Sequence, residues 1–399
     1  MNLESKYILT INGGSSSIRF AFYKIGEALY KEGFGKIERI GLKDTQLQFH
    51  FADSNEETRK ITSNDYNSVV LFLLAFLKEQ ETFRKVVAIG HRIVYGMNHT
   101  SPELITNKLL EDLYKAIPYD PEHAPGELKL IESFRQKYPT LPQVACFDTA
   151  FHQTMPEIAK MLPIPRRLYK KGIQRYGFHG LSYTYLSEEL MRISNNESVH
   201  EKLIFAHLGN GASLAAIKNG KSIDTSMGFT PAGGIPMSCR SGDIDPGLFW
   251  YLIQQENFTP EIFNQMIHHQ SGLLGISETS SDMRDLLTIE SKDGRAADAI
   301  NLFCYQVKKN IGAYTAALGG LDTLVFTGGI GENAPEIRKR ICAGMEFLGL
   351  ELDEKKNQLN EACISKDNSR VKIRIIATNE ESMIAKMTEH LWNKVKEAI

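Results

Sequence analysis

The amino-terminal stretch Ile8–Tyr23 reads ILTINGGSSSIRFAFY, two runs of strand-forming residues around a turn of very small residues. The turn holds Gly13, Gly14 and three serines, whereas a tight hairpin needs only two residues. Glycines let a backbone approach a ligand closely, and serine hydroxyls and backbone N–H groups donate hydrogen bonds to anions. The stretch therefore indicates either an anion-binding hairpin or an ordinary loop, because Gly and Ser are also common turn residues.

A second stretch repeats this pattern half a chain later. From Leu203 the sequence reads LIFAHLGNGASLAAIKNGKSIDTS, and alignment of the two stretches places Gly13 over Gly209 and Ser17 over Ser213. Both copies have a strand, a turn of small polar residues and a second strand, and the later copy adds an Asn-Gly turn and a third short strand. The repeat predicts two similar domains with one glycine-rich hairpin each, unless the likeness of two hairpins is a coincidence.

Strand-like segments alternate with amphipathic helical segments along the chain, which is typical of α/β domains. The tail from Glu380 to Ile399 is expected to be a helix, since its apolar residues recur at helical spacing. The expected strands are Tyr7–Ile11, Ser17–Tyr23, Val86–Ile89, Val144–Phe147, Leu203–Leu208, Leu214–Ile217, Thr323–Phe326 and Lys372–Ile376.

A third glycine-rich element differs from the two hairpins. The segment TLVFTGGIGENAPEIRKRI, from Thr323, predicts a strand, a Gly-Gly turn and a helix with Pro335 in its first turn. A strand followed by a glycine turn and a helix N-terminus is a common phosphate-binding arrangement. The segment matches neither the Walker A loop nor the dinucleotide fingerprint, because it lacks their spacing.

Composition excludes several classes of protein. The chain has 399 residues, enough for two domains, with 46 Lys and Arg against 48 Asp and Glu. This balance gives no bulk attraction to nucleic acid or to an anionic membrane. The five cysteines are scattered and form no CxxC pair, so we expect neither a zinc site nor a disulfide framework, in keeping with a reducing cytoplasm. No segment reaches the length of a membrane span.

Four side chains stand where chemistry is expected. Asp148 ends a buried strand, where α/β folds place ligands, although it could also cap a helix. Arg92 follows a strand and Arg240 lies in a loop, and both could clamp a carboxylate or a phosphoryl group. The alternative for Arg240 is a local ion pair with Asp243. His179 is framed by glycines in QRYGFHGLS and could donate to a phosphoryl group or serve only structure.

Two further positions suit Mg²⁺. Either Glu380 or Glu381 could bind the metal, although both could instead be present because negative charge stabilises a helix N-terminus. Asn12 could hold a metal-bound water. Glycine turns, arginines, carboxylates and a donor histidine together suit phosphoryl transfer.

These residues lie in long motifs that follow one another in a known order. The sequence resembles the acetate kinase (acetokinase) family of the acetate and sugar kinase/Hsp70/actin superfamily over nearly its whole length. The motifs that carry the resemblance are NGGSSS, GHRIVYG, FDTAFHQTMP, RYGFHG, HLGNGAS, DTSMGFTP, RSGDIDPG, SGLLGIS followed by SDMRD, FTGGIGEN and TNEE.

The resemblance implies a duplicated ribonuclease-H-like α/β fold of the actin/Hsp70 type, with two domains flanking a nucleotide cleft. The first domain would span 1–150 and be completed by the helix 380–399. The second would span 151–379 and carry nucleotide-binding and dimer-forming elements. The family's members are usually homodimers.

The resemblance also implies a reaction. It is direct, reversible in-line transfer between ATP and acetate, giving acetyl phosphate and ADP with Mg²⁺, or Mn²⁺ in its place. The implied catalytic residues are Arg92, Asp148, His179 and Arg240, and the implied metal site uses Asn12 and Glu380. Arg92, Val94, Phe178 and Pro231 would bind the acid. The implied ATP-binding residues are Ser15, Ser17, Arg19, His207, Asn210, Gly211, Asp282, Met283, Arg284, Gly329, Ile330 and Asn333.

The sequence departs from the family pattern at one implied ATP-binding residue and beside the implied acid-binding residues. Arg19 stands where the family usually has lysine, and YDPEHAPGE, with His123, replaces the usual loop beside the acyl pocket. The alternatives left open are therefore a propionate or butyrate kinase and, in another class, a non-catalytic nucleotide-gated binding protein. A pyrophosphate-using relative is disfavoured by Asp282, Arg284 and Asn333, which match an adenosine pocket.

Overall fold

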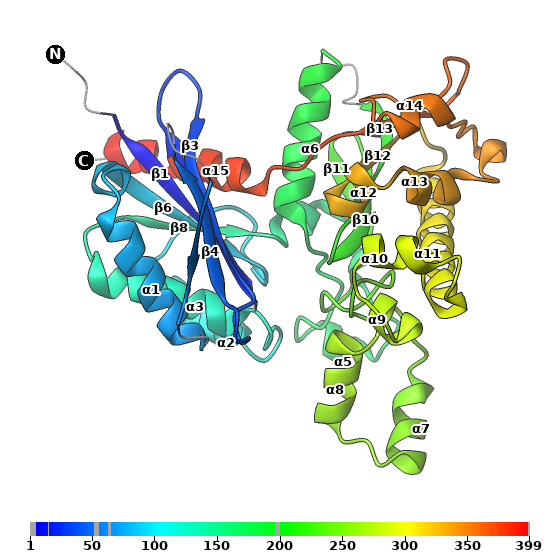
Figure 1. Ribbon diagram of the computed structural model, residues 1–399, viewed down its shortest axis with the longest axis horizontal. Coiled ribbons are helices and arrows are strands. Elements are labelled where there is room, and N and C mark those ends of the chain that lie inside the picture. Colours follow the sequence, from blue (N-terminus) through cyan, green and yellow to red (C-terminus); the bar gives the residue numbers. More distant parts are fainter. Residues whose placement is uncertain (1–4, 15, 52–55, 63–64, 196–199, 398–399) are drawn as a thin grey trace. The chain divides into compact units, whose positions relative to one another are not determined.

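The computed structural model describes residues 5–14, 16–51, 56–62, 65–195 and 200–397 and is drawn in Figure 1. Its contacts divide the chain into two compact units. Unit 1 contains residues 1–150 and 379–399, and unit 2 contains residues 151–378. The chain therefore leaves unit 1 after Ala150 and returns to it at Asn379, so that its last helix belongs with the amino-terminal sheet.

Unit 1 is built on a mixed sheet in which β1 pairs antiparallel with β2 and parallel with β6. The strand order is β5-β4-β3-β2-β1-β6-β8-β7. The strands are β1 (Tyr7–Gly13), β2 (Ser17–Lys24), β3 (Tyr30–Glu38), β4 (Gln46–Phe51), β5 (Glu57–Lys60), β6 (Val86–Ile93), β7 (Glu103–Leu104) and β8 (Gln143–Phe147).

The alternation of side chains along β2 explains how helices cover this sheet. Phe20 and Phe22 point to one face, where they pack in a core with residues of α1 and α3. Ala21 and Tyr23 point to the other face and pack with Ala385 of the last helix. Figure 1 shows the strands of unit 1 in blue and cyan and this last helix in red. The helices are α1 (Tyr66–Glu79), α2 (Asn107–Ala116), α3 (Ala124–Lys137) and α15 (Glu380–Glu397).

Unit 2 has a five-stranded sheet in the order β11-β10-β9-β12-β13. Its strands are β9 (Lys202–Leu208), β10 (Ala212–Lys218), β11 (Lys221–Thr225), β12 (Thr323–Thr327) and β13 (Lys372–Ile375). The longer helices are α6 (Gly180–Ile193), α7 (Gly247–Gln255), α8 (Pro260–His269), α11 (Gly294–Leu318) and α13 (Pro335–Cys342). Shorter helices are α4 (Glu157–Lys160), α5 (Arg166–Tyr169), α9 (Gly272–Ser277), α10 (Met283–Ile289), α12 (Gly328–Asn333) and α14 (Glu354–Gln358).

The two sheets share one topology. In unit 1, β3-β2-β1 is antiparallel and continues into parallel β6 and β8. In unit 2, β11-β10-β9 is antiparallel and continues into parallel β12 and β13. The hairpins β1–β2 and β9–β10 are thus equivalent, as the repeated sequence indicates. The fold is a duplicated mixed α/β fold, and the eight expected strands are present with ends shifted by up to four residues.

One sequence expectation needs correction. GGIGEN is not a turn before a helix, because Gly328–Asn333 itself forms the short helix α12. Its first residue, Gly328, has a φ of +77°, which glycine adopts readily, and the N–H of Gly328 donates to the Glu332 carboxylate within the same helix. The expected last helix is present as α15, and it is helical through Glu397, the last described residue, with Met383, Ile384 and Ala385 buried in its first half.

The described helices include none that is long and apolar enough to cross a membrane. All five cysteines lie in the described residues and are free thiols.

Candidate active site

Polar side chains gather in unit 1 where β1, β6 and β8 end and α15 begins. Arg92, near the end of β6, donates from Nε and Nη2 to Oδ2 of Asp148, at 2.9 and 2.5 Å, and from Nη1 to Oδ1 of Asn12, at 3.2 Å. The Asn12 amide nitrogen donates to Oε2 of Glu380 at 3.2 Å. The structure therefore joins four of the predicted residues in one chain of hydrogen bonds at the carboxyl ends of parallel strands.

This cluster is rich in negative charge. Asp148 is fully buried, and its Oδ1 has no hydrogen-bond partner among the described residues. Burial raises the pKa of Glu380 to about 7, while Arg92 opposes that rise and the Asp148 charge adds to it. Burial lowers the pKa of Arg92, but the carboxylates around it outweigh burial and hold the pKa well above its ordinary value. The buried Oδ1 of Asp148, which lies in the same cluster as the Glu380 carboxyl group, can accept a cation or a hydrogen bond from a ligand.

These donors fit Mg²⁺ held with the help of a nucleotide. The oxygens of Asp148, Glu380 and Asn12 are of the hard type that Mg²⁺ prefers, and this ion usually binds one or two carboxylates together with substrate phosphates. Among the described residues, no three His, Cys, Asp or Glu side chains form a self-sufficient metal cage. The arrangement suits a metal that arrives with its nucleotide.

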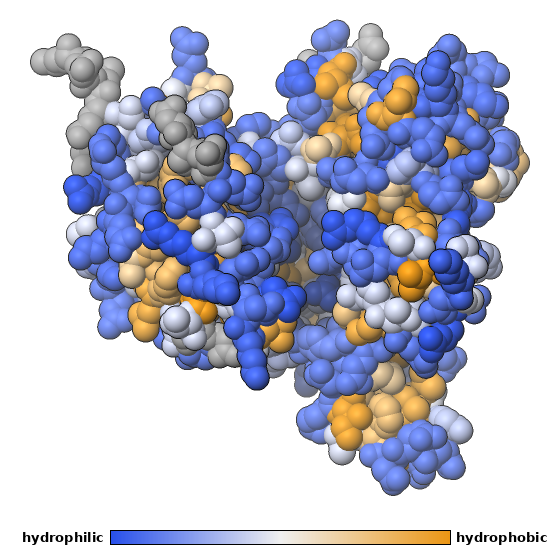
Figure 2. All heavy atoms as spheres, viewed as in Figure 1, coloured by the Kyte–Doolittle hydropathy of each residue, from blue (hydrophilic) through white to orange (hydrophobic). Residues whose placement is uncertain are grey.

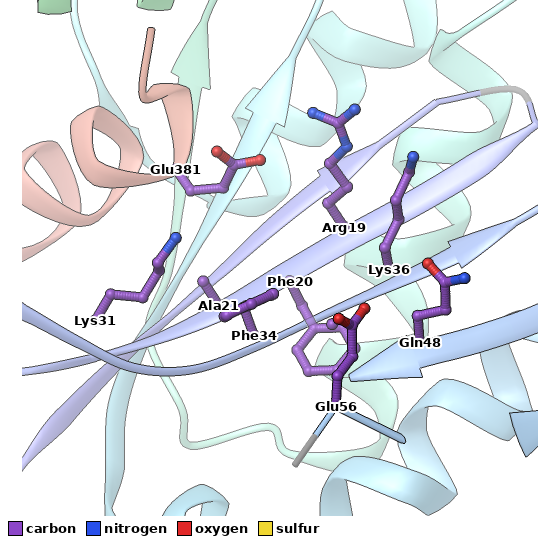
Figure 3. A pocket seen from close by; sticks show the side chains of 10 residues that line it. Arg19, Phe20, Ala21, Lys31, Phe34, Lys36, Gln48, Glu56 and Glu381 are labelled. Atoms are coloured by element: carbon purple, nitrogen blue, oxygen red, sulfur yellow. The ribbon is translucent and has the colours of Figure 1, made fainter. Parts of the chain in front are cut away.

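Glu380 and Glu381 have different surroundings. Glu380 is bonded to Asn12, whereas Glu381 lines a pocket of about 240 Å³ with Arg19, Lys31 and Lys36. Figure 3 shows Glu381 reaching from the start of α15 toward the strands that carry these cations. Arg19 lies directly opposite Asn12 in the β1–β2 pairing.

Ser17 is one of the two hairpin serines that are expected to contact ATP. Ser17 begins β2, and its carbonyl accepts from the N–H of Gly14 at 2.7 Å, which closes the turn. Ser15, the other serine expected to contact ATP, lies outside the described residues.

Of the residues that the resemblance implies for acid binding, some belong to unit 1 and some to unit 2. Val94 is buried in unit 1, and its N–H donates to Oε1 of Glu127 at 3.0 Å. Glu127 is itself buried on α3, and burial together with the nearby Asp120 raises its pKa well above the ordinary range. Phe178 and Pro231, both buried, belong to unit 2.

His179 occupies a strained turn at the start of α6 in unit 2. Its φ is +61°, a conformation that few non-glycine residues adopt, and it follows Gly177, whose φ is +75°. His152 supports this turn, because its Nε2 lies 3.1 Å from the carbonyl oxygen of Phe178. Strain of this kind persists when the surroundings determine the conformation, and it often marks functional positions.

Both predicted phosphate-contacting side chains of unit 2 converge on the β9–β10 turn. A Cβ atom added to Gly211 would lie 3.2 Å from Nε2 of His179 and 3.8 Å from Nη1 of Arg240. The Nη1 group of Arg240 is also 3.4 Å from the carbonyl of Pro231. Asp243, the possible local partner of Arg240, accepts instead from the N–H of Gly234 at 2.8 Å.

The residues of unit 2 that are expected to contact adenosine lie on or next to short helices. Asp282 caps α10, with Met283 buried behind it, and Arg284 donates to the Asp282 carboxylate. On α12, Asn333 is exposed and its amide donates to the carbonyl of Gly329 at 3.0 Å. A Cβ added to Gly209 would lie 3.8 Å from the Gly329 nitrogen. The β9–β10 turn, which contains Asn210 and Gly211, is therefore next to the start of α12, which contains Ile330.

Comparison with known proteins decides which family this fold represents. The sequence profile of the Acetokinase family matches residues 7–386. The acetate kinase of Thermoanaerobacterium thermosaccharolyticum is 45% identical over 402 aligned residues, which cover 98% of this chain and all of that protein. The chain belongs to the acetokinase family. It is accordingly a carboxylate-phosphorylating kinase that uses ATP.

Solved acetokinase structures agree with this assignment. Acetate kinase of Porphyromonas gingivalis superimposes with a TM-score of 0.87 at 36% identity, covering 97% of this chain and 99% of that one. A propionate kinase from Francisella tularensis superimposes with a TM-score of 0.90 at 40% identity, covering 96% and 99%. The family fold is thus shared by enzymes named for two different acids.

Sequence reasoning missed several residues that the acetokinase fold brings to these positions. Glu127 was unremarked within the altered loop, and Ser182 and Ser213 contact the site histidines. Arg338 is fully buried and donates to the carbonyls of Gly331 and Glu332 in α12. The sequence signal for Arg338 was its position on the otherwise apolar side of α13, which indicates a buried arginine.

Proposed function

We propose that this acetokinase transfers the γ-phosphoryl group of ATP to acetate, giving acetyl phosphate and ADP. The proposal is carried by two sets of groups, one present in each unit. Unit 1 offers Arg92 beside the open oxygen of Asp148, and unit 2 offers His179 and Arg240 converging on a glycine turn. One set suits a small anion and a cation, and the other suits a phosphoryl group.

The proposed reaction is an in-line displacement. An acetate oxygen forms a bond to the γ-phosphorus while the bond from that phosphorus to the β,γ-bridging oxygen breaks, and the electron pair leaves with ADP. Acetate is already an anion, so the step needs no strong general base. Catalysis then depends on positioning the acid and stabilising the charge on the phosphoryl oxygens, for which Arg92, His179 and Arg240 are suited.

Mg²⁺ would be held by Glu380 and Asp148, with Asn12 orienting Glu380, and Mn²⁺ suits the same oxygen ligands. When bound, the metal neutralises charge on the nucleotide phosphates. Glu380 is favoured over Glu381 because it belongs to the hydrogen-bonded chain that ends at Arg92. Ser17 and Arg19, together with the neighbouring Ser15, would assist the phosphates from the β1–β2 hairpin.

The second candidate is propionate as the preferred acid. It is favoured by the likeness to the Francisella propionate kinase, and the loop around His123 departs from the family pattern beside the implied acyl pocket. One methylene changes binding by only about 1–3 kcal/mol, so a few pocket residues decide the preference.

The deciding assay measures ADP formation from MgATP with acetate, propionate or butyrate, and traps the product with hydroxylamine. Pyrophosphate replaces ATP in one control, and Arg240→Ala protein serves in another. We expect the highest kcat/KM with acetate and an acyl hydroxamate product. A higher kcat/KM with propionate or butyrate would change the substrate, and nucleotide binding without dependence on any acid would support a nucleotide-gated binding protein instead.

We also propose that the protein is a cytoplasmic homodimer. In Figure 2 apolar atoms gather over α7 and α8, where the exposed fractions are 67% for Trp250, 57% for Tyr251 and 47% for Ile262. Exposed aromatic patches of this kind usually mark an interface. Sedimentation of the wild type and of Trp250→Glu is expected to show a dimer and a weakened dimer. A monomeric wild type would refute the dimer.

A further inference from the structure

The two site histidines of unit 2 share an unusual environment. The rings of His179 and His207 are stacked, with centroids 4.2 Å apart and planes inclined by 20°. The Nδ1 atom of each ring faces a serine hydroxyl at 2.9 Å, Ser213 for His179 and Ser182 for His207. Both serines are fully buried. Each ring therefore has one nitrogen occupied by a hydroxyl group, which can either donate or accept.

A second hydroxyl stands behind each serine. The hydroxyl of Tyr183, on α6, is hydrogen-bonded to Ser213. The hydroxyl of Thr378 lies 2.8 Å from Ser182. The unit thus contains two parallel hydroxyl chains, which we name the Tyr183 chain (Tyr183, Ser213, His179) and the Thr378 chain (Thr378, Ser182, His207).

The opposite nitrogens of the two rings face the glycine turn. A Cβ at Gly211 would lie 3.2 Å from Nε2 of His179, and one at Gly209 would lie 3.9 Å from Nε2 of His207. In the proposed function this turn contacts phosphate. A neutral imidazole can favour a phosphate oxygen from Nε2 only if Nε2 carries the hydrogen, so that Nδ1 must accept one.

We propose that the two hydroxyl chains hold His179 and His207 as neutral rings with the proton on Nε2, making Ser213 and Ser182 positioning residues. Tyr183 or Thr378 donates to the serine, and the serine donates to Nδ1. The inference deepens the proposed function, on which its catalytic part rests. The two histidines would then donate hydrogen bonds to phosphate oxygens as neutral groups and would not transfer protons.

The kind of partner at Nδ1 supports this assignment. A carboxylate there would accept a hydrogen bond from Nδ1–H and so favour the imidazolium or the Nδ1–H tautomer, whereas a hydroxyl can donate to Nδ1. The stacking acts in the same direction, because two positive rings at this separation would repel each other. Donors that start neutral and fixed need no reorganisation when charge develops on the phosphoryl oxygens.

The Thr378 chain also reaches the nucleotide loop. The N–H of Thr378 donates to Oε1 of Glu332 at 3.2 Å, and the same oxygen accepts from the N–H of Gly328 at 2.8 Å. Glu332 and Gly328 belong to α12. The position of Thr378, and through Ser182 that of His207, is thereby tied to the helix expected to contact adenosine.

The test reads the tautomers directly. Protein labelled with ¹⁵N-histidine is examined by NMR at pH 7.5 without nucleotide, and the two rings are assigned with His179→Gln and His207→Gln. We expect both rings to show the Nε2–H tautomer in the wild type. In Ser213→Ala the His179 signals should move toward a mixture of tautomers while those of His207 remain. An Nδ1–H tautomer or an imidazolium in the wild type would overturn the proposal.

Kinetics test the catalytic consequence separately. Ser213→Ala is expected to lower kcat on the order of 10-fold with little change in either KM, since His179 would act on the transition state. Ser182→Ala should mainly raise the KM for MgATP. Ser187→Ala, on the same helix α6, is the matched control and should behave as wild type. Unchanged kinetics in both test variants would refute the positioning role. If no acid is phosphorylated at all, the proposed function fails, and the tautomers still decide the hydroxyl chains.

Discussion

Arg92 places two hydrogen bonds on a single oxygen of Asp148 and leaves the other oxygen, Oδ1, without a partner among the described residues. The pair is almost wholly inside unit 1, since the exposed fractions of the two side chains are 16% and 0%. The arginine is therefore fixed by a carboxylate that keeps capacity for a further ligand. One oxygen of Asp148 therefore orients Arg92, and the other oxygen can accept a ligand.

Arg92 can be tested by removing one partner or both. Arg92→Ala should lower kcat by roughly 10²–10³-fold, as expected for loss of a transition-state donor. It should also lower the free energy of unfolding by about 3–5 kcal/mol, because it leaves a buried carboxylate uncompensated. Arg92→Leu combined with Asp148→Asn should recover much of the stability and none of the activity. Urea unfolding and initial rates measure the two effects, and equal recovery of both would contradict the assignment.

The two glutamates at the start of α15 should respond differently to metal. Glu380→Gln should raise the Mg²⁺ concentration needed for half-maximal activity about tenfold or more, because it removes a charged ligand. Glu381→Gln is the matched control and should leave that concentration nearly unchanged. Activity is measured against Mg²⁺ at fixed, saturating ATP. A larger effect at Glu381 would transfer the ligand role to that residue.

Glu127 should make stability depend on pH in a defined direction. Its pKa is raised well above that of an unfolded glutamate, which is about 4.3. The stability that it contributes is complete below pH 4.3 and is lost as pH rises through its raised pKa. Glu127→Gln keeps an acceptor for the Val94 N–H and cannot ionise.

We therefore expect Glu127→Gln to stabilise the protein more at pH 8 than at pH 5. Glu127→Leu, which removes the acceptor, should cost about 1–3 kcal/mol at pH 5. The free energy of unfolding is obtained from urea titrations at both pH values. A pH-independent effect of Glu127→Gln would show that this carboxyl does not titrate differently in the folded state.

His91 should lower the free energy of unfolding at acid pH, whereas Glu127 lowers it at higher pH. It is buried beside Phe134, and burial lowers its pKa to about 3. The unfolded histidine takes up a proton near pH 6.5, so stability is complete above that pH and is lost as pH falls toward 3. The loss from this residue approaches about 1.4 kcal/mol per pH unit.

His91→Phe should reduce that acid sensitivity, as measured by thermal or urea unfolding between pH 7 and pH 5. His390, which is exposed on α15, provides the control substitution His390→Gln and should leave the slope unchanged. An unaltered slope in His91→Phe would exclude His91 as a source of acid lability.

The sequence predicted the central strands well because they are short, apolar and bounded by glycine or polar residues. It did not predict β3, β4 and β5, although β4 alternates polar and apolar residues (QLQFHF), which is a strand pattern that was overlooked. Gly33 and Gly35 interrupt β3, and all four residues of β5 are exposed. These strands are held by pairing with neighbours more than by their own composition. The Gly-Gly segment at Gly328 was misjudged because a carboxylate four residues away caps it into a helix.

Sequence alone determined the family, the duplicated hairpins and the types of residue available for phosphoryl transfer, because local patterns and long motifs are sufficient to recognise them. Only the tertiary structure decided which groups are partners. Asn12 and Glu380 are 368 residues apart and share a hydrogen bond. His207 contacts Ser182, and Ser182 contacts Thr378, although the three residues come from separate segments. Hydrogen bonds and burial depend on distance in space, and the positions that share them carry no common local pattern. Protonation, pairing and the choice between neighbouring glutamates therefore follow from the fold.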